Sequence, residues 1–247
     1  MSPEINAEEH LVEHYATLGC LKSDFRNLNL FHLVAAVVTG KNVIDIGCGA
    51  AFLANILKER GKHVVGIEPS GGMRALAAEI NPGVAIIPGM AEDVDALVRE
   101  PVDAVLMIDV LEHIEKDVEQ IKKVLAVLKK GGEFVFVVPA HSFLFGKRDE
   151  QMGHYRRYSK KRLTELLESN GFRIKFLRHW NALGFLPYLI SEKVLRKPLN
   201  SKLRQIAKHG VLSALMQKGL NFWFSRIENN FDFGFGLSII GVARKES

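Results

Sequence analysis

Cysteine is scarce in this sequence of 247 residues, in which only Cys20 and Cys48 occur. Two cysteines do not imply a disulfide framework, and no Cys/His cluster has the spacing of a zinc site. No apolar run is long enough to span a bilayer, and the polar, acidic start MSPEINAEEH lacks the features of a secretory signal. These absences predict a cytoplasmic protein in a reducing compartment.

Most of the chain also lacks an excess of basic charge, because the basic residues collect in one late segment. The net charge is +5, and residues 181–230 alone contain eight Lys or Arg and two Asp or Glu, which leaves the rest of the chain at −1. Apolar clusters alternate with these charges, as in amphipathic helices. We expect a packed lid that roofs a pocket. Contact with another subunit or peripheral contact with an anionic membrane surface are the alternatives.

Apolar segments of strand type alternate with helical segments along most of the chain. Such alternation is typical of a parallel sheet wound on both faces, and continuously apolar strands fit burial on both sides. The sequence therefore predicts an α/β fold with a doubly wound, mostly parallel sheet of seven strands and a helical insertion before the last strand. Strands are expected over 42–47, 63–69, 84–89, 102–110, 133–139, 172–180 and 236–245. Helices are expected over 8–18, 23–39, 50–60, 72–80, 116–130 and 160–170.

The segment NVIDIGCGAAFLANIL (42–57) places a Gly-x-Gly turn between the first strand and a helix. Open parallel sheets bind ligands beyond the carboxyl ends of their strands, and Gly47 and Gly49 allow a ligand to approach the main chain closely. Glu68 ends the next strand, where such an acid accepts hydrogen bonds from ribose hydroxyls in nucleoside-binding folds. A dinucleotide fingerprint is not completed, because Phe52 stands at its last small position, and no Walker lysine follows. The turn predicts a small polar ligand of nucleoside type.

Five motifs over residues 40–180 resemble those of class I S-adenosylmethionine-dependent methyltransferases, of the type that includes quinone-biosynthesis and sugar methyltransferases. They are VIDIGCGAAFLA, VVGIEPS, GMAEDVDAL, DAVLMIDVLEHI and VLKKGGEFVFVVPA, in family order and at family spacing. One departure is Ala51, which stands where the family has a third glycine. The resemblance implies a Rossmann-like methyltransferase fold and S-adenosylmethionine as cofactor, with S-adenosylhomocysteine as product. The domains are then N-terminal helices covering the cofactor site (1–40), the cofactor-binding core (41–180), the basic helical insertion (181–232) and the last strand (233–247).

The resemblance also implies a role for each matching residue at the cofactor site. Glu68 would bind both ribose hydroxyls, and Ile108 and Asp109 would flank the adenine and the mouth of the substrate cavity. Alternatively, Asp45 caps the next helix, Glu68 is a surface acid and Met73 belongs to the core. The residues expected to line the methionine half are Asp45, Gly47, Cys48 and Gly49, and those expected around the adenine are Pro69, Met73, Met90, Ala91 and Glu92.

A second polar stretch, PAHSFLFGKRDEQMGHYRRYSKKRL (139–163), follows the fifth strand. His154 is the first candidate for a general base, because histidine titrates near neutrality, and His141 at the strand tip is the second. Arginines in this stretch could hold an anionic group. Alternatively, they pair with acids, and His154 only orients Asp149. The side chains expected to contact the substrate are Tyr155, Arg157 and Tyr158.

Two further motifs bear on the acceptor and on metal binding. The pattern D-x-x-x-GHYRRY (149–158) resembles a methyltransferase subgroup associated with glycosyl or lipid-linked substrates. In LEHI (111–114), Glu112 and His113 are expected to position a helix or the cavity wall, since the remaining ligands of a metal site are missing. No metal is therefore predicted.

The leading hypothesis is O-methylation of a small-molecule acceptor that is lipid-like, quinone-like or glycan-like. An RNA or other nucleic-acid methyltransferase is a first alternative, raised by the basic segment. It is disfavoured because the fourth strand ends in IDVLEH rather than in the Asn/Asp-Pro-Pro-Tyr/Phe tip used for exocyclic amines, and no RNA-binding module is present. A non-catalytic regulator of the same fold that binds the cofactor or a partner is a second alternative.

Overall fold

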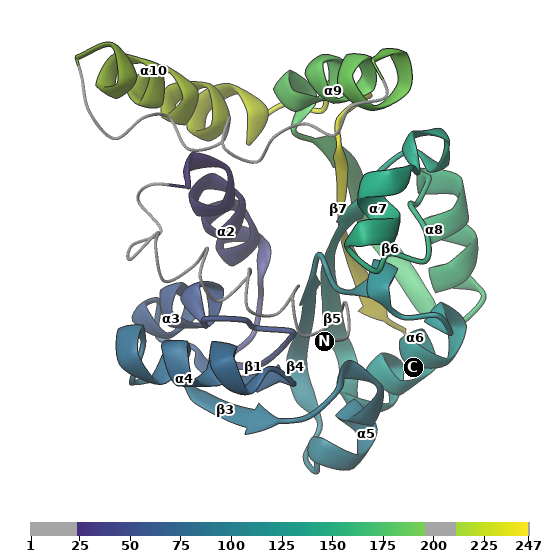
Figure 1. The fold of residues 1–247 in the computed structure, drawn as a ribbon. Helices are drawn as coiled ribbons and strands as arrows, with labels where there is room; N and C mark the ends of the chain where they lie inside the picture. Colours follow the sequence, from purple (N-terminus) through teal and green to yellow (C-terminus); the bar gives the residue numbers. More distant parts are fainter. Residues whose placement is uncertain (1–23, 196–210, 247) are drawn as a thin grey trace, which may run out of the picture.

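The structure, a computed structural model, describes residues 24–195 and 211–246 (Figure 1). Its centre is one sheet of seven strands in the order β3-β2-β1-β4-β5-β7-β6. Strands β1 to β5 pair in parallel, and β7 lies antiparallel between β5 and β6. The predicted doubly wound, mostly parallel sheet is thus confirmed. The strands are β1 (Asn42–Ile46), β2 (His63–Glu68), β3 (Ala85–Pro88), β4 (Val102–Ile108), β5 (Leu128–Pro139), β6 (Phe172–Trp180) and β7 (Ser238–Lys245).

Helices cover both faces of this sheet. Apolar side chains of α2 and α3 pack on one face, and those of α6 and α8 pack on the other. The helix expected over 8–18 lies outside the described residues. The described α-helices are α2 (Phe25–Val37), α3 (Phe52–Glu59), α4 (Gly71–Ile80), α5 (Val94–Leu97), α6 (Asp117–Val127), α7 (Lys147–Gln151), α8 (Lys160–Glu168), α9 (Ala182–Leu189) and α10 (Val211–Phe222). Short helical turns are η2 (Ala91–Asp93), η3 (Leu111–His113), η4 (Ser142–Leu144), η5 (Ile190–Val194) and η7 (Trp223–Glu228).

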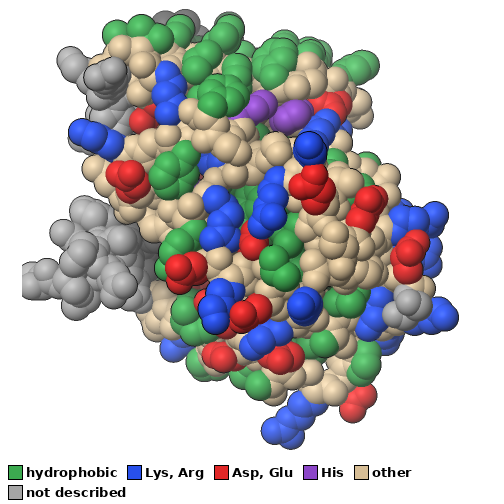
Figure 2. Space-filling model, turned by 90° about the vertical axis from the view of Figure 1, so that its right-hand side faces the viewer, with side chains coloured by type: hydrophobic (Ala, Val, Ile, Leu, Met, Phe, Trp, Pro, Cys, Tyr) green, Lys and Arg blue, Asp and Glu red, His purple; other side chains and the backbone are tan. Residues whose placement is uncertain are grey.

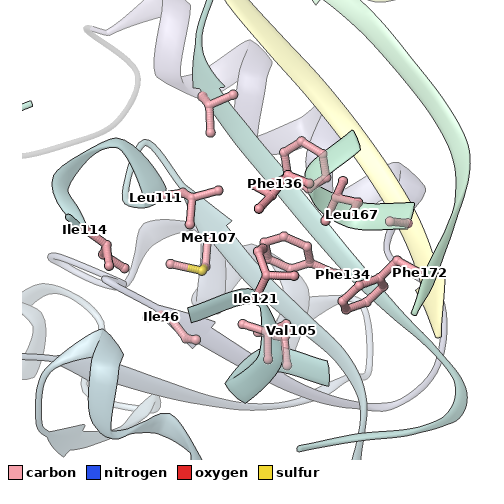
Figure 3. Packing of buried hydrophobic residues seen from close by; sticks show 14 of the residues in the cluster. Ile46, Val105, Met107, Leu111, Ile114, Ile121, Phe134, Phe136, Leu167 and Phe172 are labelled. Carbon is pink, nitrogen blue, oxygen red and sulfur yellow. The ribbon is translucent and has the colours of Figure 1, made fainter. Parts of the chain in front are cut away.

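The larger core lies between the sheet and the helices α6 and α8 (Figure 3). Phe134 and Phe136 of β5 stack with ring centroids 5.0 Å apart, and both side chains are wholly buried. Burial of a side chain of this size contributes about 1.5–3 kcal/mol. Because both faces of β4 and β5 are covered, these strands are held rigidly, and the loops that follow them start from fixed points.

The helix expected over 116–130 ends earlier, at Val127, and β5 begins at Leu128. Leu128 pairs with Val102 of β4, and Lys129 forms an ion pair of 2.7 Å with Asp103. These contacts with β4 outweigh the helical propensity of the Leu-Lys-Lys run, because propensity differences are fractions of a kcal/mol per residue.

The insertion is helical in its described parts. Figure 1 places α9 and α10 together at one end of the molecule, beyond α2 and the start of β7. Buried Glu228 accepts hydrogen bonds from the Ala182 N–H (2.8 Å) and the Trp223 ring N–H (2.9 Å), which ties the two halves of the insertion together. On the face drawn in Figure 2, hydrophobic side chains gather at the top, where α9 lies in Figure 1. Among the described residues, no helix is both long and apolar enough to cross a bilayer.

Candidate active site at the carboxyl edge of the sheet

The turn after β1 uses left-handed backbone at three of its five residues. The φ angles are +69° at Gly47, +52° at Gly49 and +61° at Ala51. The Gly47 N–H donates to the Ile67 carbonyl of β2 (2.8 Å), which fixes the turn to the next strand. Ala51 carries a Cβ in a region that favours glycine, which costs on the order of 1–2 kcal/mol. Helix α3 starts at this point without a side-chain cap. Asp45 therefore does not cap it.

The two glycines of the turn have different structural roles. A Cβ on Gly47 would lie 2.5 Å from a methyl group of Val110, so Gly47 makes room for a neighbouring side chain. Within residues 24–195 and 211–246, a Cβ on Gly49 would meet only the terminal methyl group of Met73, at 3.9 Å. The thiol of Cys48 packs against Gly66 of β2, and burial raises the pKa of that thiol. Of these residues, Gly49 is the one that leaves space for a ligand beside its main chain.

Two acids face the turn from β1 and β2. Glu68 accepts the Gly49 N–H on one carboxylate oxygen (2.8 Å) and the Ser70 N–H on the other (3.0 Å). Asp45 is 2% exposed, and its Oδ2 atom has no hydrogen-bond partner among the described residues. Burial, and then the nearby Glu68 carboxylate, raise the pKa of Asp45 to about 7. A buried carboxylate without a partner is unfavourable, so this place suits a ligand that carries positive charge.

The residues expected around the adenine are brought to the same edge of the sheet. They follow β2, β3 and β4, and the carboxyl ends of parallel neighbours lie side by side. Met73 is buried on α4, and Ile108 and Asp109 are half-buried at the end of β4. Asp109 has a φ of +54°, and its N–H donates to the Val137 carbonyl (2.9 Å). Around this edge Pro69, Met90 and Glu92 are exposed, and Ala91 is half-buried.

Arg26 of α2 belongs to the same edge, although the sequence did not single it out. Its guanidinium is 3.5 Å from the Asp109 carboxylate and 3.4 Å from the Ser238 hydroxyl, and it lies over the Trp180 ring. The side chain is only 14% exposed. The only sequence signal for this role is that Arg26 is a lone cation in the otherwise uncharged helix FRNLNLFHLVAAV.

The polar stretch after β5 forms a closed network around Asp149. The His154 Nδ1 atom lies 2.9 Å from a carboxylate oxygen of Asp149, and Arg157 Nε donates to both oxygens (2.8 and 2.9 Å). Burial acts to raise the pKa of Asp149, but the hydrogen bonds from His154 and Arg157 prevail and lower it. Arg157 also donates to the Tyr188 hydroxyl (2.5 Å). Arg157 is therefore buried and bound to protein partners. This agrees with the alternative in which the arginines pair with acids.

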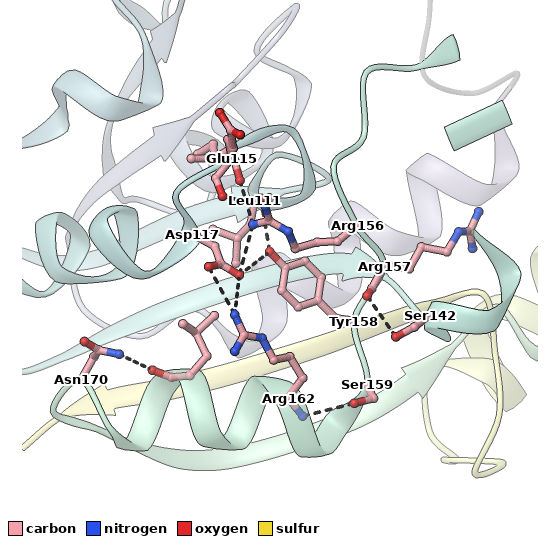
Figure 4. Close-up of polar contacts among 12 residues, drawn as sticks. Leu111, Glu115, Asp117, Ser142, Arg156, Arg157, Tyr158, Ser159, Arg162 and Asn170 are labelled. Atoms are coloured by element: carbon pink, nitrogen blue, oxygen red, sulfur yellow. Dashed lines mark hydrogen bonds and ion pairs between the residues drawn. The ribbon is translucent and has the colours of Figure 1, made fainter. Parts of the chain in front are cut away.

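Tyr158 is wholly buried, and its hydroxyl lies 3.4 Å from the Leu111 carbonyl and 3.3 Å from a carboxylate oxygen of Asp117. Figure 4 shows Arg156 and Arg162 reaching the same Asp117. These contacts make Tyr158 part of the core, and Arg157 and Tyr158, both predicted to contact the substrate, are bound to protein partners instead. The remaining predicted contact, Tyr155, is 52% exposed beside the Arg156 guanidinium.

His141, the second candidate base, lies in a separate aromatic cluster. Its ring stacks on His179 with centroids 5.0 Å apart, and Phe143 and Phe185 flank it. The residue adopts a φ of +65°, and its Nε2 atom is buried without a partner. Burial lowers the pKa of His141, so the ring is neutral near pH 7 and able to accept a proton.

Comparison with known proteins shows the kind of domain. Residues 23–175 match a family model described as a methyltransferase domain. A "Probable S-adenosylmethionine-dependent methyltransferase" from Mycolicibacterium smegmatis is 26% identical over 148 residues, which cover 59% of this chain and 57% of that protein. A ubiquinone biosynthesis O-methyltransferase from Vibrio vulnificus is 32% identical over 101 residues, which cover 39% and 43%. The chain thus spans about half the length of the curated relatives it matches.

A solved structure covers almost the whole chain. It is described as a SAM-dependent methyltransferase, possible histamine N-methyltransferase, from Thermotoga maritima, and it superimposes with a TM-score of 0.62 over 97% of this chain and 99% of its own. The sequence identity is 20%, so this likeness shows the fold alone.

Proposed function

This chain belongs to the methyltransferase-domain family, and from that membership we propose that it transfers a methyl group from S-adenosylmethionine to an oxygen of a small-molecule acceptor. The observation that carries this proposal is the pair of acids at the glycine turn. Asp45 has a buried, unpartnered carboxylate oxygen, and Glu68 is fixed beside the open backbone of Gly49. A cationic ligand with a ribose fits this arrangement.

S-adenosylmethionine, when bound, supplies a methyl group on a positively charged sulfur, which is a good leaving group. Asp45 would offset positive charge of the ligand, and each Glu68 oxygen keeps a lone pair for a ribose hydroxyl beyond its backbone N–H bond. Gly49 would give the ligand room at the main chain, with Gly47 and Cys48 holding the turn in shape. The proposed adenine surroundings are Pro69, Met73, Met90, Ala91, Glu92, Ile108 and Asp109.

Methyl transfer to a hydroxyl requires that the oxygen lose its proton as the new bond forms. His154 is the proposed acceptor of that proton at Nε2, because its Nδ1 atom is held by Asp149. The acceptor oxygen would supply the electrons of the new C–O bond, the electrons of the broken C–S bond would stay on the sulfur, and the positive charge would pass with the proton to the imidazole. His141 is the second candidate, as a neutral ring whose Nε2 atom has no partner.

An apolar part of the acceptor is favoured by the surface of the insertion. Its described helices expose large apolar side chains, among them Leu183, Leu186, Ile190, Leu215, Met216 and Phe222. We propose a lipid-like, quinone-like or glycan-like acceptor for this chain, and the name of the Vibrio relative, a ubiquinone biosynthesis O-methyltransferase, agrees with a quinone. Peripheral membrane contact through the insertion remains a prediction.

Two experiments test this function. Calorimetry with S-adenosylmethionine tests the cofactor, and the absence of heat at millimolar ligand would contradict the cofactor site and favour a regulator that has lost it. Incubation of the protein with methyl-labelled cofactor and a cell extract tests the acceptor, after separation into lipid, small-molecule and nucleic-acid fractions. Label in the lipid or small-molecule fraction is expected. Label confined to nucleic acid would overturn the acceptor class.

A further inference from the structure

Three side chains that could ligate a metal meet between the η3 turn and the segment after α7. One ligand atom each of Glu112, His113 and His154 lies within 4.8 Å of the other two. We propose that these residues bind one divalent transition-metal ion. The sequence showed Glu112 and His113 without a third ligand, and the fold supplies His154 from 41 positions further along the chain.

The two segments are joined by backbone contacts and not only by the side chains of the cluster. The Tyr155 N–H donates to the Glu112 carbonyl (2.8 Å). The Arg156 guanidinium donates to the Ile114 carbonyl (3.0 Å) and to the Glu115 carbonyl (2.6 Å). These bonds fix the segment that carries His154 against the segment that carries Glu112. A site held in this way is preorganised, because little chain freedom is lost when the ion binds.

A hydrogen bond to a neighbouring group holds each histidine ring. His154 is held at Nδ1 by Asp149 (2.9 Å), and Arg157 in turn holds Asp149. His113 hydrogen-bonds with the backbone of Gly153, which lies on the side of its Nδ1 atom. The rings meet edge to face, with centroids 4.6 Å apart. Metal-ligating histidines characteristically donate their second N–H to a carboxylate or a backbone carbonyl, and the Asp149 bond at Nδ1 leaves the Nε2 atom of His154 for an ion.

Glu112 supplies an independent observation. It is 1% exposed, and its Oε2 atom is buried without a hydrogen-bond partner in the described part of the chain. A buried carboxylate oxygen without a donor is unfavourable, and the Arg157 and Arg26 charges act on Glu112 without bonding to this oxygen. A cation between Glu112 and the two imidazoles would supply a partner for it.

The ligand set indicates the class of ion. Two imidazole nitrogens and one carboxylate oxygen suit Zn²⁺, Mn²⁺, Fe²⁺ or Co²⁺, whereas Mg²⁺ and Ca²⁺ prefer oxygen ligands alone. Three protein ligands leave at least one position open, as in catalytic metal sites. Glu112 follows Asp109 at the tip of β4, so the open position would lie near the proposed mouth of the acceptor cavity.

The binding of the ion is independent of methyl transfer, whereas its role at the acceptor rests on the function proposed above. With the ion bound, His154 is a ligand and not a free base. The ion would then polarise the acceptor oxygen and make its proton easier to lose to solvent. Without an ion, the same side chain is the base.

The test uses the full-length chain without a histidine tag, stripped of metal with a chelator and titrated with Co²⁺. Visible absorption and calorimetry report the binding. One Co²⁺ per chain is expected. His154→Ala and Glu112→Gln should each weaken the affinity by at least about tenfold, and Asp149→Asn by about tenfold. The control His63→Ala, which removes an exposed histidine at the start of β2, should change nothing.

Thermal unfolding of each variant checks that it is folded. If Glu112→Gln does not fold, His154→Ala alone tests the site. The site is overturned if Co²⁺ does not bind, or if it binds His154→Ala as tightly as the unaltered chain. Calorimetry with S-adenosylmethionine on the metal-free protein is run in parallel. If the cofactor binds but Co²⁺ does not, only the proposed metal site is refuted. If Co²⁺ binds but the cofactor does not, only the proposed function is refuted.

Discussion

Asp45→Asn is expected to stabilise the protein and, at the same time, to weaken its binding of S-adenosylmethionine. The pKa of Asp45 is about 7, raised from an ordinary value of 3.8 by burial and then by Glu68. A raised pKa stabilises the folded state below about pH 4, and that contribution is lost as the pH rises through 7. The difference is about three pH units, and each is worth about 1.36 kcal/mol. At pH 8 the buried charge therefore costs up to about 4 kcal/mol, which an uncharged asparagine would recover.

The affinity for the cofactor should move in the opposite direction, because a cationic ligand favours the ionised form of Asp45. With a pKa of about 7, roughly one tenth of Asp45 is ionised at pH 6, so the affinity should fall about tenfold from pH 8 to pH 6. Glu68 is the charged group that faces Asp45, and it is unchanged in the variant. Asp45→Asn should bind more weakly at pH 8 and lose this pH dependence.

The measurements are urea unfolding and calorimetry with S-adenosylmethionine, each at pH 6 and pH 8. Asp103→Asn is the matched control, an acid at the start of β4 that lies beside the opposite end of β1. Asp103 accepts the Lys41 and Asn42 N–H groups (2.8 Å each), and these bonds together with Lys129 lower its pKa to about 2. Its stabilisation is present above about pH 4 and is lost as the pH falls through 2, so this variant should be less stable at both pH 6 and pH 8. An Asp45→Asn protein that is less stable at pH 8, or that binds with unchanged affinity and pH dependence, would refute the reasoning.

Three further substitutions separate the parts of the site. Glu68→Ala should weaken cofactor affinity at least about tenfold, since it removes a charge-assisted acceptor worth about 1.5–3 kcal/mol, whereas calorimetry showing unchanged affinity would place the ribose elsewhere. His154→Ala should lower turnover on the identified acceptor by about 10²-fold or more with cofactor affinity nearly kept, and unchanged turnover would remove His154 from the chemistry. Tyr158→Phe should lower the free energy of unfolding by about 1 kcal/mol and leave affinity and turnover alone, so a loss confined to substrate KM would restore Tyr158 to the substrate site.

The sequence alone determined the architecture and the position of the glycine turn. Apolar strand segments, the glycines at 47 and 49 and the acid at 68 are local signals, because each reflects what one short stretch of chain can adopt. For this reason the sheet and its edge were predicted, and β6 was predicted from its first to its last residue, Phe172–Trp180. The end of α6 was predicted less well, since pairing of Leu128 with β4 decides it.

Only the tertiary structure decided which side chains meet. It filled the space at Gly47 with Val110, buried Tyr158 in the core, and placed Arg26 of α2 beside Asp109. It also brought His154 to His113. Contacts between distant segments depend on how whole elements pack, and no periodicity or spacing within one segment records them. Local sequence therefore predicts where the site lies, whereas tertiary packing decides which chemical groups meet there.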